Sequence, residues 1–316
     1  MPSQSNPPPD DRDKARVCRE TYSALRTQFN GDLLRASDPG YEEARTIWNG
    51  MVARRPDLIA CCTDVSDVRT AVRVASDIGI LTAVGCGGYS LAGFSTCDGG
   101  LVIDLSRMRD VSVDPDARRA RVAGGCLLGS IDTATQKAGL VFPSGVVSHT
   151  GASGLILGGG TGWLTRRFGL SCDNVEAFTL VTADGSIARA DSKHNADLFW
   201  ALRGGGGNFG VVIDFELKLH PVKSVVLAEG LTPEDNIRKL LECWRGFMAE
   251  APFDVKWNLD LGLAPHKSKV PAQLRGRPVA GSSLIWTGAR KPQSRIFRAL
   301  FRCVIPIPCA AKPYRT

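Results

Sequence analysis

The sequence lacks any long hydrophobic run, although 43% of its 316 residues are hydrophobic. A helix that spans a membrane needs about 20 consecutive apolar residues, so we expect no membrane partner. The N-terminus is polar and acidic and lacks the basic and apolar regions of a signal peptide. These features predict a cytoplasmic protein with a packed core, in which residues 1–30 form a leader and a first helix.

Metal-binding patterns are also scarce. The chain has 4 histidines without ligand spacing and 10 scattered cysteines without a CxxC pair. Structural zinc sites need such closely spaced ligands, so we expect no metal site. Several cysteines lie in apolar, strand-like segments such as 58–62, which favours buried, reduced thiols.

Acidic residues are absent after Asp260, where 11 basic residues follow. Residues 222–316 carry 16 Lys or Arg against 7 Asp or Glu, within an overall net charge of +7. A nucleic-acid surface is one interpretation, but aromatic residues are weakly interleaved and no nucleic-acid-binding motif is present. A solvated basic face is the better interpretation, and we expect no nucleic-acid partner.

Hydrophobic periodicity divides the chain into helices and strands. Helical spacing predicts helices over 14–29, 66–79, 127–138, 195–202, 233–249 and 294–301. Alternation or short apolar runs predict strands over 58–62, 81–84, 101–105, 111–113, 120–122, 175–182, 186–190, 211–219, 253–263 and 283–287. Ser66 is placed to cap its helix and Gly79 to end it, so that 58–84 forms a βαβ unit. Because strands and helices mix without regular alternation, an α+β fold is favoured.

Glycine is concentrated in three runs, each of which borders an apolar segment. The runs lie in 83–90, 145–164 and 198–212. Without a Cβ atom, a glycine backbone can approach a ligand closely and adopt positive φ. Turns and helix caps also use glycine, and they would explain a single run equally well. Three runs within 130 residues favour a cofactor that lies along main-chain amides.

One of these runs contains the spacing GxGxxG at Gly205, Gly207 and Gly210. As a dinucleotide fingerprint, this spacing must follow a strand and open a helix, whose N-terminus then faces the pyrophosphate. The predicted order is the reverse, with a helix before the glycines and a strand after them. The Rossmann interpretation is therefore rejected.

Four segments carry a specific resemblance: 84–90 (VGCGGYS), 154–164 (GLILGGGTGWL), 167–174 (RFGLSCDN) and 198–212 (LFWALRGGGGNFGVV). In their order and spacing the chain resembles the berberine bridge enzyme-like branch of the vanillyl-alcohol oxidase superfamily. Members are FAD enzymes with a PCMH-type FAD-binding domain, and the match runs from about Arg55 to Val222. The resemblance implies such a domain, of two α+β subdomains, over 31–222. An incomplete substrate domain with an antiparallel sheet would follow over 223–316.

The resemblance also assigns the cofactor contacts. The 84–90 loop would wrap the pyrophosphate, 148–164 would pass the ribityl chain and flavin ring, and 208–212 would return along the cofactor. The residues implied are Gly85, Cys86, Gly87, Gly88, Tyr89, Ser90, Ser148, His149, Thr150, Gly151, Ser153, Gly154, Gly158, Gly159, Gly160, Gly162, Trp163, Asn208, Gly210, Val211 and Val212. For His149, an ordinary hydrogen-bonded loop histidine is the alternative.

Two departures from the family concern the covalent attachment of flavin. Many members tether it through a histidine in the loop that matches 84–90, where this chain has Tyr89. Many add a thioether from a cysteine whose place is held here by Val147. Neither bond can form at these positions, so the expectation is non-covalent FAD.

A third departure concerns the catalytic base. The family's usual tyrosine or carboxylate in the later half has no counterpart, because the tyrosines are Tyr22, Tyr41, Tyr89 and Tyr314. Catalytic residues therefore stay unknown. Asp260 and Lys256, on the polar face of the 253–263 strand, are the local candidates, with a solvated face as the alternative.

The resemblance implies an FAD-dependent oxidoreductase that accepts hydride from an alcohol, carbohydrate or natural-product substrate, with dioxygen as electron acceptor. Two alternatives stay open: a flavin- or substrate-binding protein without redox turnover, and a non-redox isomerase or cyclase. A bulky residue at Gly159 or Gly160 is expected to abolish FAD binding by filling cofactor space. The apolar face of the 253–263 strand needs partners, which predicts a homodimer through residues 222–316.

Overall fold

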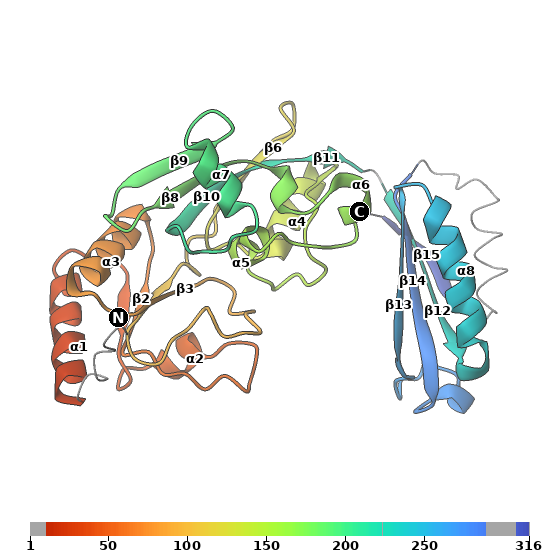
Figure 1. The fold of residues 1–316 in the computed structure, drawn as a ribbon, viewed down its shortest axis with the longest axis horizontal. Coiled ribbons are helices and arrows are strands. Elements are labelled where there is room, and N and C mark those ends of the chain that lie inside the picture. The colour runs from red at the N-terminus through yellow and green to blue at the C-terminus, as the bar shows by residue number, and fades with distance from the viewer. Residues whose placement is uncertain (1–10, 223, 289–307, 316) are drawn as a thin grey trace, which may run out of the picture.

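The computed structural model describes residues 11–222, 224–288 and 308–315. Figure 1 shows two parts, an N-terminal module (residues 11–222) and a C-terminal lobe (residues 224–288 and 308–315). The predicted leader before residue 11 and the predicted 294–301 helix lie outside the described residues. The mixed helices and antiparallel sheets confirm the α+β class.

The first sheet of the N-terminal module has the strand order β1-β2-β4-β3. Its strands are β1 (Asp32–Leu34), β2 (Leu58–Cys61), β4 (Leu101–Asp104) and β3 (Thr82–Gly85), with helices α1 (Asp11–Arg26), α2 (Tyr41–Arg45) and α3 (Val65–Ile78) around them. Strands β2 and β3 both pair in parallel with β4, which lies between them. The predicted parallel βαβ unit is confirmed, with this third strand inserted.

The ends of α3 test the predicted capping residues. Gly79 adopts the left-handed conformation (φ 71°) and ends the helix as predicted. At the other end, the Asp64 side chain accepts a hydrogen bond from the Asp67 amide, so the prediction of Ser66 as the cap is wrong. Asp64 lies two residues earlier, and its carboxylate also suits the positive end of the helix dipole.

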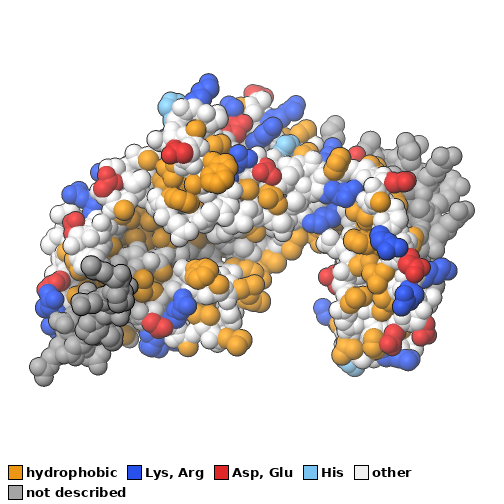
Figure 2. Space-filling model, viewed as in Figure 1, with side chains coloured by type: hydrophobic (Ala, Val, Ile, Leu, Met, Phe, Trp, Pro, Cys, Tyr) orange, Lys and Arg blue, Asp and Glu red, His pale blue; other side chains and the backbone are white. Residues whose placement is uncertain are grey.

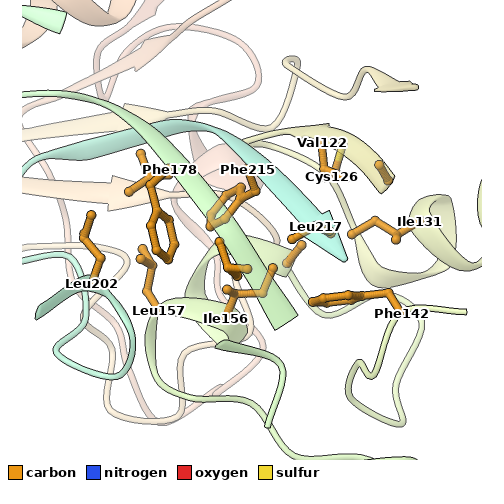
Figure 3. Packing of buried hydrophobic residues seen from close by; sticks show 14 of the residues in the cluster. Val122, Cys126, Ile131, Phe142, Ile156, Leu157, Phe178, Leu202, Phe215 and Leu217 are labelled. Carbon is orange, nitrogen blue, oxygen red and sulfur yellow. The ribbon is translucent and has the colours of Figure 1, made fainter. Parts of the chain in front are cut away.

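The second sheet is antiparallel and has the order β5-β6-β10-β8-β9. Its strands are β5 (Val111–Asp114), β6 (Arg119–Ala123), β10 (Val211–Lys218), β8 (Val175–Val181) and β9 (Ile187–Asp191). The helices of this half of the module are α4 (Leu128–Lys137), α5 (Ala152–Leu157), α6 (Thr165–Phe168) and α7 (Ala196–Leu202). Two short strands, β7 (Leu140–Val141) and β11 (His220–Pro221), pair with each other. Figure 3 shows the core between the sheet and the helices, where Phe178 and Phe215 meet Ile156 and Leu157 of α5. The α7–loop–β10 order confirms that the GxGxxG spacing has the wrong context for a Rossmann fold.

The C-terminal lobe is a four-stranded antiparallel sheet of order β13-β14-β12-β15 with one long helix. Its elements are β12 (Ser224–Pro233), α8 (Ile237–Glu250), β13 (Val255–Leu263), β14 (Pro278–Trp286) and β15 (Pro308–Arg315). Helix α8 covers the face that carries Val255 and Trp257, with Leu240 fully inside. The predicted apolar face therefore has a partner within the chain, except that Leu261 is 65% exposed.

The cysteines follow the prediction of reduced thiols at seven positions. The free thiols are those of Cys18, Cys61, Cys62, Cys86, Cys97, Cys126 and Cys172. Cys243 is in a disulfide, so the prediction is wrong there. In the described part of the chain, no helix is both long and apolar enough to cross a membrane. The same residues contain no cluster of His, Cys, Asp or Glu that could hold a metal ion.

Candidate cofactor site

The short helix α5 is the point on which the glycine runs converge. Ile156 and Leu157 on one side of α5 are buried in the core, at 0% and 7% exposure. Gly154 lies on the exposed side, and a Cβ atom built there would meet no atom within 4 Å. The core therefore fixes the helix and leaves a bare surface at Gly154.

The 85–90 loop meets the N-terminal end of α5. It leaves β3 after Gly85, and a Cβ atom built on Gly87 would lie only 2.5 Å from the Gly151 nitrogen. Only glycine at both positions allows the two backbones to approach so closely. The predicted 84–90 loop and the start of the predicted 148–164 segment are thus brought together, as expected for two parts of one site.

An aromatic cluster forms where the family tether would be. The Tyr89 ring lies 4.8 Å from the Trp48 ring and 5.3 Å from the His149 ring, measured between centroids. The His149 ring meets Tyr89 edge-on, at an interplanar angle of 67°. Tyr89 is therefore held between two rings at the edge of the site, and Trp48 was not predicted.

The 158–162 run has a packing role that the sequence did not predict. A Cβ atom on Gly160 would lie 2.4 Å from the Ser171 hydroxyl, and one on Gly162 would lie 1.7 Å from the Ser144 carbonyl oxygen. Gly159 and Gly160 also have positive φ, at 104° and 78°. The need for glycine at Gly160 and Gly162 thus comes from neighbouring protein atoms, which corrects the prediction that a side chain at Gly160 would enter cofactor space.

The third glycine run meets the C-terminal end of α5. The Gly206 amide donates to the Leu157 carbonyl at 3.0 Å. Gly210 has φ 142° and packs against the Val181 carbonyl. Asn208 is exposed and donates its side-chain amide to Gly205.

Several predicted contacts can involve only the main chain, because their side chains face the protein interior. Val211 and Val212 are 5% and 3% exposed within the core. The Ser153 hydroxyl donates to the Gly124 carbonyl, and the Cys86 thiol donates to the Cys126 carbonyl at 3.5 Å. Burial raises the pKa of Cys86 to about 11, so this thiol stays protonated at neutral pH.

The remaining predicted residues lie on the loops around α5. Ser148 is exposed, and its carbonyl accepts the Gly129 amide at 2.8 Å. The Thr150 carbonyl accepts the Leu128 amide at 3.0 Å, so the 148–151 loop is attached to the start of α4. Gly158 is exposed after α5, and Trp163 is half-buried before α6.

Two features of the 88–96 segment fit the polar part of FAD. The main-chain amides of Gly88, Tyr89 and Ser90 donate to no acceptor among the described residues. The hydroxyls of Ser95 and Thr96 are buried, also without a partner in that part of the chain. Buried or partly buried donors normally have acceptors, so these groups are free for a polar, anionic ligand such as a pyrophosphate. The residues fit.

The C-terminal lobe faces this site across a cleft that Figure 2 shows between the two parts. Strand β13 carries the proposed base candidates on the side opposite α8. The Lys256 ammonium donates to the Gly162 carbonyl at 2.5 Å, and burial lowers its pKa. Asp260 is exposed. Lys256 is therefore engaged with the N-terminal module, which leaves Asp260 as the free candidate of the two.

Two arginines of α6, which were not predicted as functional residues, connect the N-terminal module to the C-terminal lobe. The Arg167 guanidinium lies 3.0 Å from the Asp254 carboxylate and donates to the Thr287 carbonyl. The Arg166 guanidinium donates to the Ala251 carbonyl at 2.7 Å. In the sequence both arginines directly follow the second glycine run, and Arg167 begins the 167–174 segment that carries the family resemblance.

Comparison with known proteins agrees with this geometry. A family model described as an FAD binding domain matches residues 56–191. The chain is similar to (R)-6-hydroxynicotine oxidase of Paenarthrobacter nicotinovorans, with 38% identity over 212 residues that cover 67% of this chain and 46% of the relative. An FAD-linked oxidoreductase of Dictyostelium discoideum is 37% identical over 238 residues, which cover 75% and 52%. The solved xylooligosaccharide oxidase of Myceliophthora thermophila has a TM-score of 0.80 at 25% identity, over 94% of this chain and 61% of that one.

The fold and the converging glycine segments define a PCMH-type FAD-binding module. Residues 56–191 match an FAD-binding domain, and the homologues of the chain are FAD-linked oxidoreductases of the PCMH-type, berberine bridge enzyme-like family, which confirms the resemblance seen in the sequence. It spans about half the length of the curated relatives that it matches.

Proposed function

We propose that this protein is an FAD-dependent oxidoreductase that binds its flavin without a covalent bond. The convergence of three glycine segments on α5, beside the free amides of Gly88, Tyr89 and Ser90, is the observation that carries the proposal. The 85–90 loop would hold the pyrophosphate, and the 148–154 segment would lie along the rest of the cofactor. We also propose the division into residues 31–222 for FAD and 223–316 for part of a substrate domain.

Bound FAD would supply the hydride acceptor, and the chain's own residues would supply binding and orientation. A small-molecule substrate would lie in the cleft between the 148–164 segment and β13, with dioxygen as the proposed electron acceptor. The side of β13 opposite α8 presents Asn258 and Asp260, and Ser283 of β14 lies opposite Asn258. These polar groups would orient the substrate, and an alcohol, a carbohydrate or a natural product would each suit them. The related 6-hydroxynicotine and xylooligosaccharide oxidases act on small molecules.

The proposal predicts that flavin is released by acid. Tyr89 and Val147 cannot form the family's two covalent bonds, so precipitation with trichloroacetic acid should leave a yellow supernatant and a colourless pellet. Absorbance of both fractions measures the partition. Colour that stays in the washed pellet would show a covalent bond elsewhere, with His149 as the first residue to examine by peptide mapping.

Flavin binding without redox turnover is the second candidate function. It is favoured by the engagement of Lys256 with Gly162, which leaves the described part of β13 with Asp260 as its one free candidate base. Anaerobic titration with panels of sugars, alcohols and amines separates the two functions. Bleaching of the flavin near 450 nm by any member supports the oxidoreductase. Formation of product without bleaching or peroxide would instead support an isomerase or cyclase.

Self-association is proposed through the edge of the C-terminal sheet. Strand β13 lies at one edge of the described sheet, and its Leu261 and Leu263 are 65% and 69% exposed. An apolar, unpaired edge strand favours pairing with another copy. Sedimentation velocity over a range of concentrations should show a dimer that is lost when both leucines are changed to lysine. A compact monomer at all concentrations would contradict the prediction.

A further inference from the structure

The peptide groups of Gly162 are held from both sides. Its amide donates to the Thr165 hydroxyl at 2.8 Å, within the N-terminal module. Its carbonyl accepts from the Lys256 ammonium of the C-terminal lobe at 2.5 Å and, more weakly, from the Thr165 amide at 3.4 Å. Gly162 also packs against Ser144, so it has little room to shift. A residue of β13 thus contacts the end of the glycine run that directly follows α5, the helix on which the proposed FAD-binding segments converge.

The environment of Lys256 shows that this contact is specific. The side chain is partly buried, and the Gly162 carbonyl is its one hydrogen-bond partner among the described residues. None of the ion pairs found in that part of the chain includes Lys256. A partly buried ammonium depends on such a charge-assisted bond, because leaving it without one would cost desolvation free energy. The free energy therefore favours the state in which Lys256 stays hydrogen-bonded to Gly162.

The surrounding contacts make the docking local. Arg166 and Arg167 follow Gly162 by four and five positions and bind Ala251, Asp254 and Thr287 of the C-terminal lobe. These contacts involve a short segment on each side. Residues 162–167 provide them on the N-terminal module, and residues 251–256 with Thr287 provide them on the C-terminal lobe. Movement of the lobe must therefore move, or release, the end of the glycine run.

We propose that Lys256 is a positioning residue that couples docking of the C-terminal lobe to FAD binding. This rests on the proposed FAD function and gives Lys256 a role other than the catalytic base. In the docked state, Lys256 holds the 158–162 run in place, and through it the end of α5, the helix on which the proposed FAD-binding segments converge. By linkage the effect is reciprocal: FAD stabilises docking by the same factor by which docking strengthens FAD binding.

The test uses Lys256→Met in the full chain, because methionine keeps an apolar stem and removes the ammonium. Lys239→Met is the matched control, since Lys239 is exposed on α8, on the other side of the sheet. The dissociation constant of FAD is measured by flavin fluorescence on apoprotein. We expect Lys256→Met to weaken FAD binding about tenfold, within the usual range of such coupling, and Lys239→Met to leave it unchanged.

A second readout separates coupling from simple loss of structure. Hydrogen exchange of peptides that cover residues 251–257 should slow when FAD is added to the wild-type protein. This protection should disappear in Lys256→Met, and Lys256→Arg, which keeps a charged donor, should restore both protection and affinity. Wild-type affinity in Lys256→Met, failure of Lys256→Arg to restore binding, or an equal effect of Lys239→Met would each overturn the proposal. Failure of wild-type apoprotein to bind FAD would instead reject the proposed function.

Discussion

Gly162→Ala should destabilise the protein by about 3 kcal/mol or more, the upper part of the range for overpacking. The added Cβ atom would lie 1.7 Å from the Ser144 carbonyl oxygen and 2.8 Å from its carbonyl carbon. These are backbone atoms and cannot swing aside, so the 143–145 and 161–163 segments must separate. The midpoint of urea unfolding, measured on apoprotein, gives the free energy without any contribution from cofactor.

Gly154 provides the matched comparison. A Cβ atom there meets nothing within 4 Å, and the residue lies within α5. Gly154→Ala should leave stability unchanged or raise it by up to about 1 kcal/mol, since alanine favours a helix over glycine. Gly154→Leu should keep the fold but lose FAD, because its side chain would project from the exposed side of α5. Normal FAD content in Gly154→Leu would place the cofactor elsewhere.

This pair replaces the substitution that the sequence suggested. Gly160→Val would lose FAD whether or not the cofactor is near, because valine would clash with Ser171 and strain a positive φ. A sequence shows that glycines are clustered, but it does not show whether each one faces a ligand or another part of the chain. Only the fold separates the bare surface at Gly154 from the packed contact at Gly160.

The regular elements were predictable where periodicity was strong. The 253–263 strand alternates clearly, and β13 occupies 255–263. Strand β12 was missed because its partners, β14 and β15, lie tens of residues away, so that only tertiary pairing shows it. Helix α5 was missed because its six residues include Gly154, and their helical conformation depends on packing into the core.

The site was predictable as a set of segments and not as a set of contacts. The order of the glycine motifs carried the family resemblance, and that resemblance correctly predicted that 84–90 lies beside the start of 148–164. The contact of Tyr89 with Trp48, and that of Lys256 with Gly162, join residues 41 and 94 positions apart. Neither spacing is a helix or strand period, so no local pattern indicates it. The sequence also did not show that the side chains of Ser153 and Cys86 turn inward, because their partners, the carbonyls of Gly124 and Cys126, are distant in sequence.

Asp132→Asn should stabilise the protein at alkaline pH. Asp132 lies in α4, and the Ser144 hydroxyl donates to its carboxylate at 3.4 Å. Burial is the main cause of its raised pKa, which goes from 3.8 to about 6, and the bond from Ser144 opposes that shift. Asparagine can accept the same hydrogen bond and carries no charge, so it avoids the cost of a buried carboxylate.

The sign of the pH dependence follows from this shift. Well above pH 6 the carboxylate is ionised in both states, and its burial opposes folding by up to about 3 kcal/mol. As the pH falls from about 6 towards 4, the native protein binds a proton that the unfolded chain does not yet bind, so this cost disappears. The advantage of Asp132→Asn in urea midpoint should therefore be largest at pH 8 and absent near pH 4. Asp116→Asn, in the exposed β5–β6 turn, is the control and should change little at either pH. An advantage of equal size at both values would show that asparagine acts through packing and that burial of the charge is not the cause.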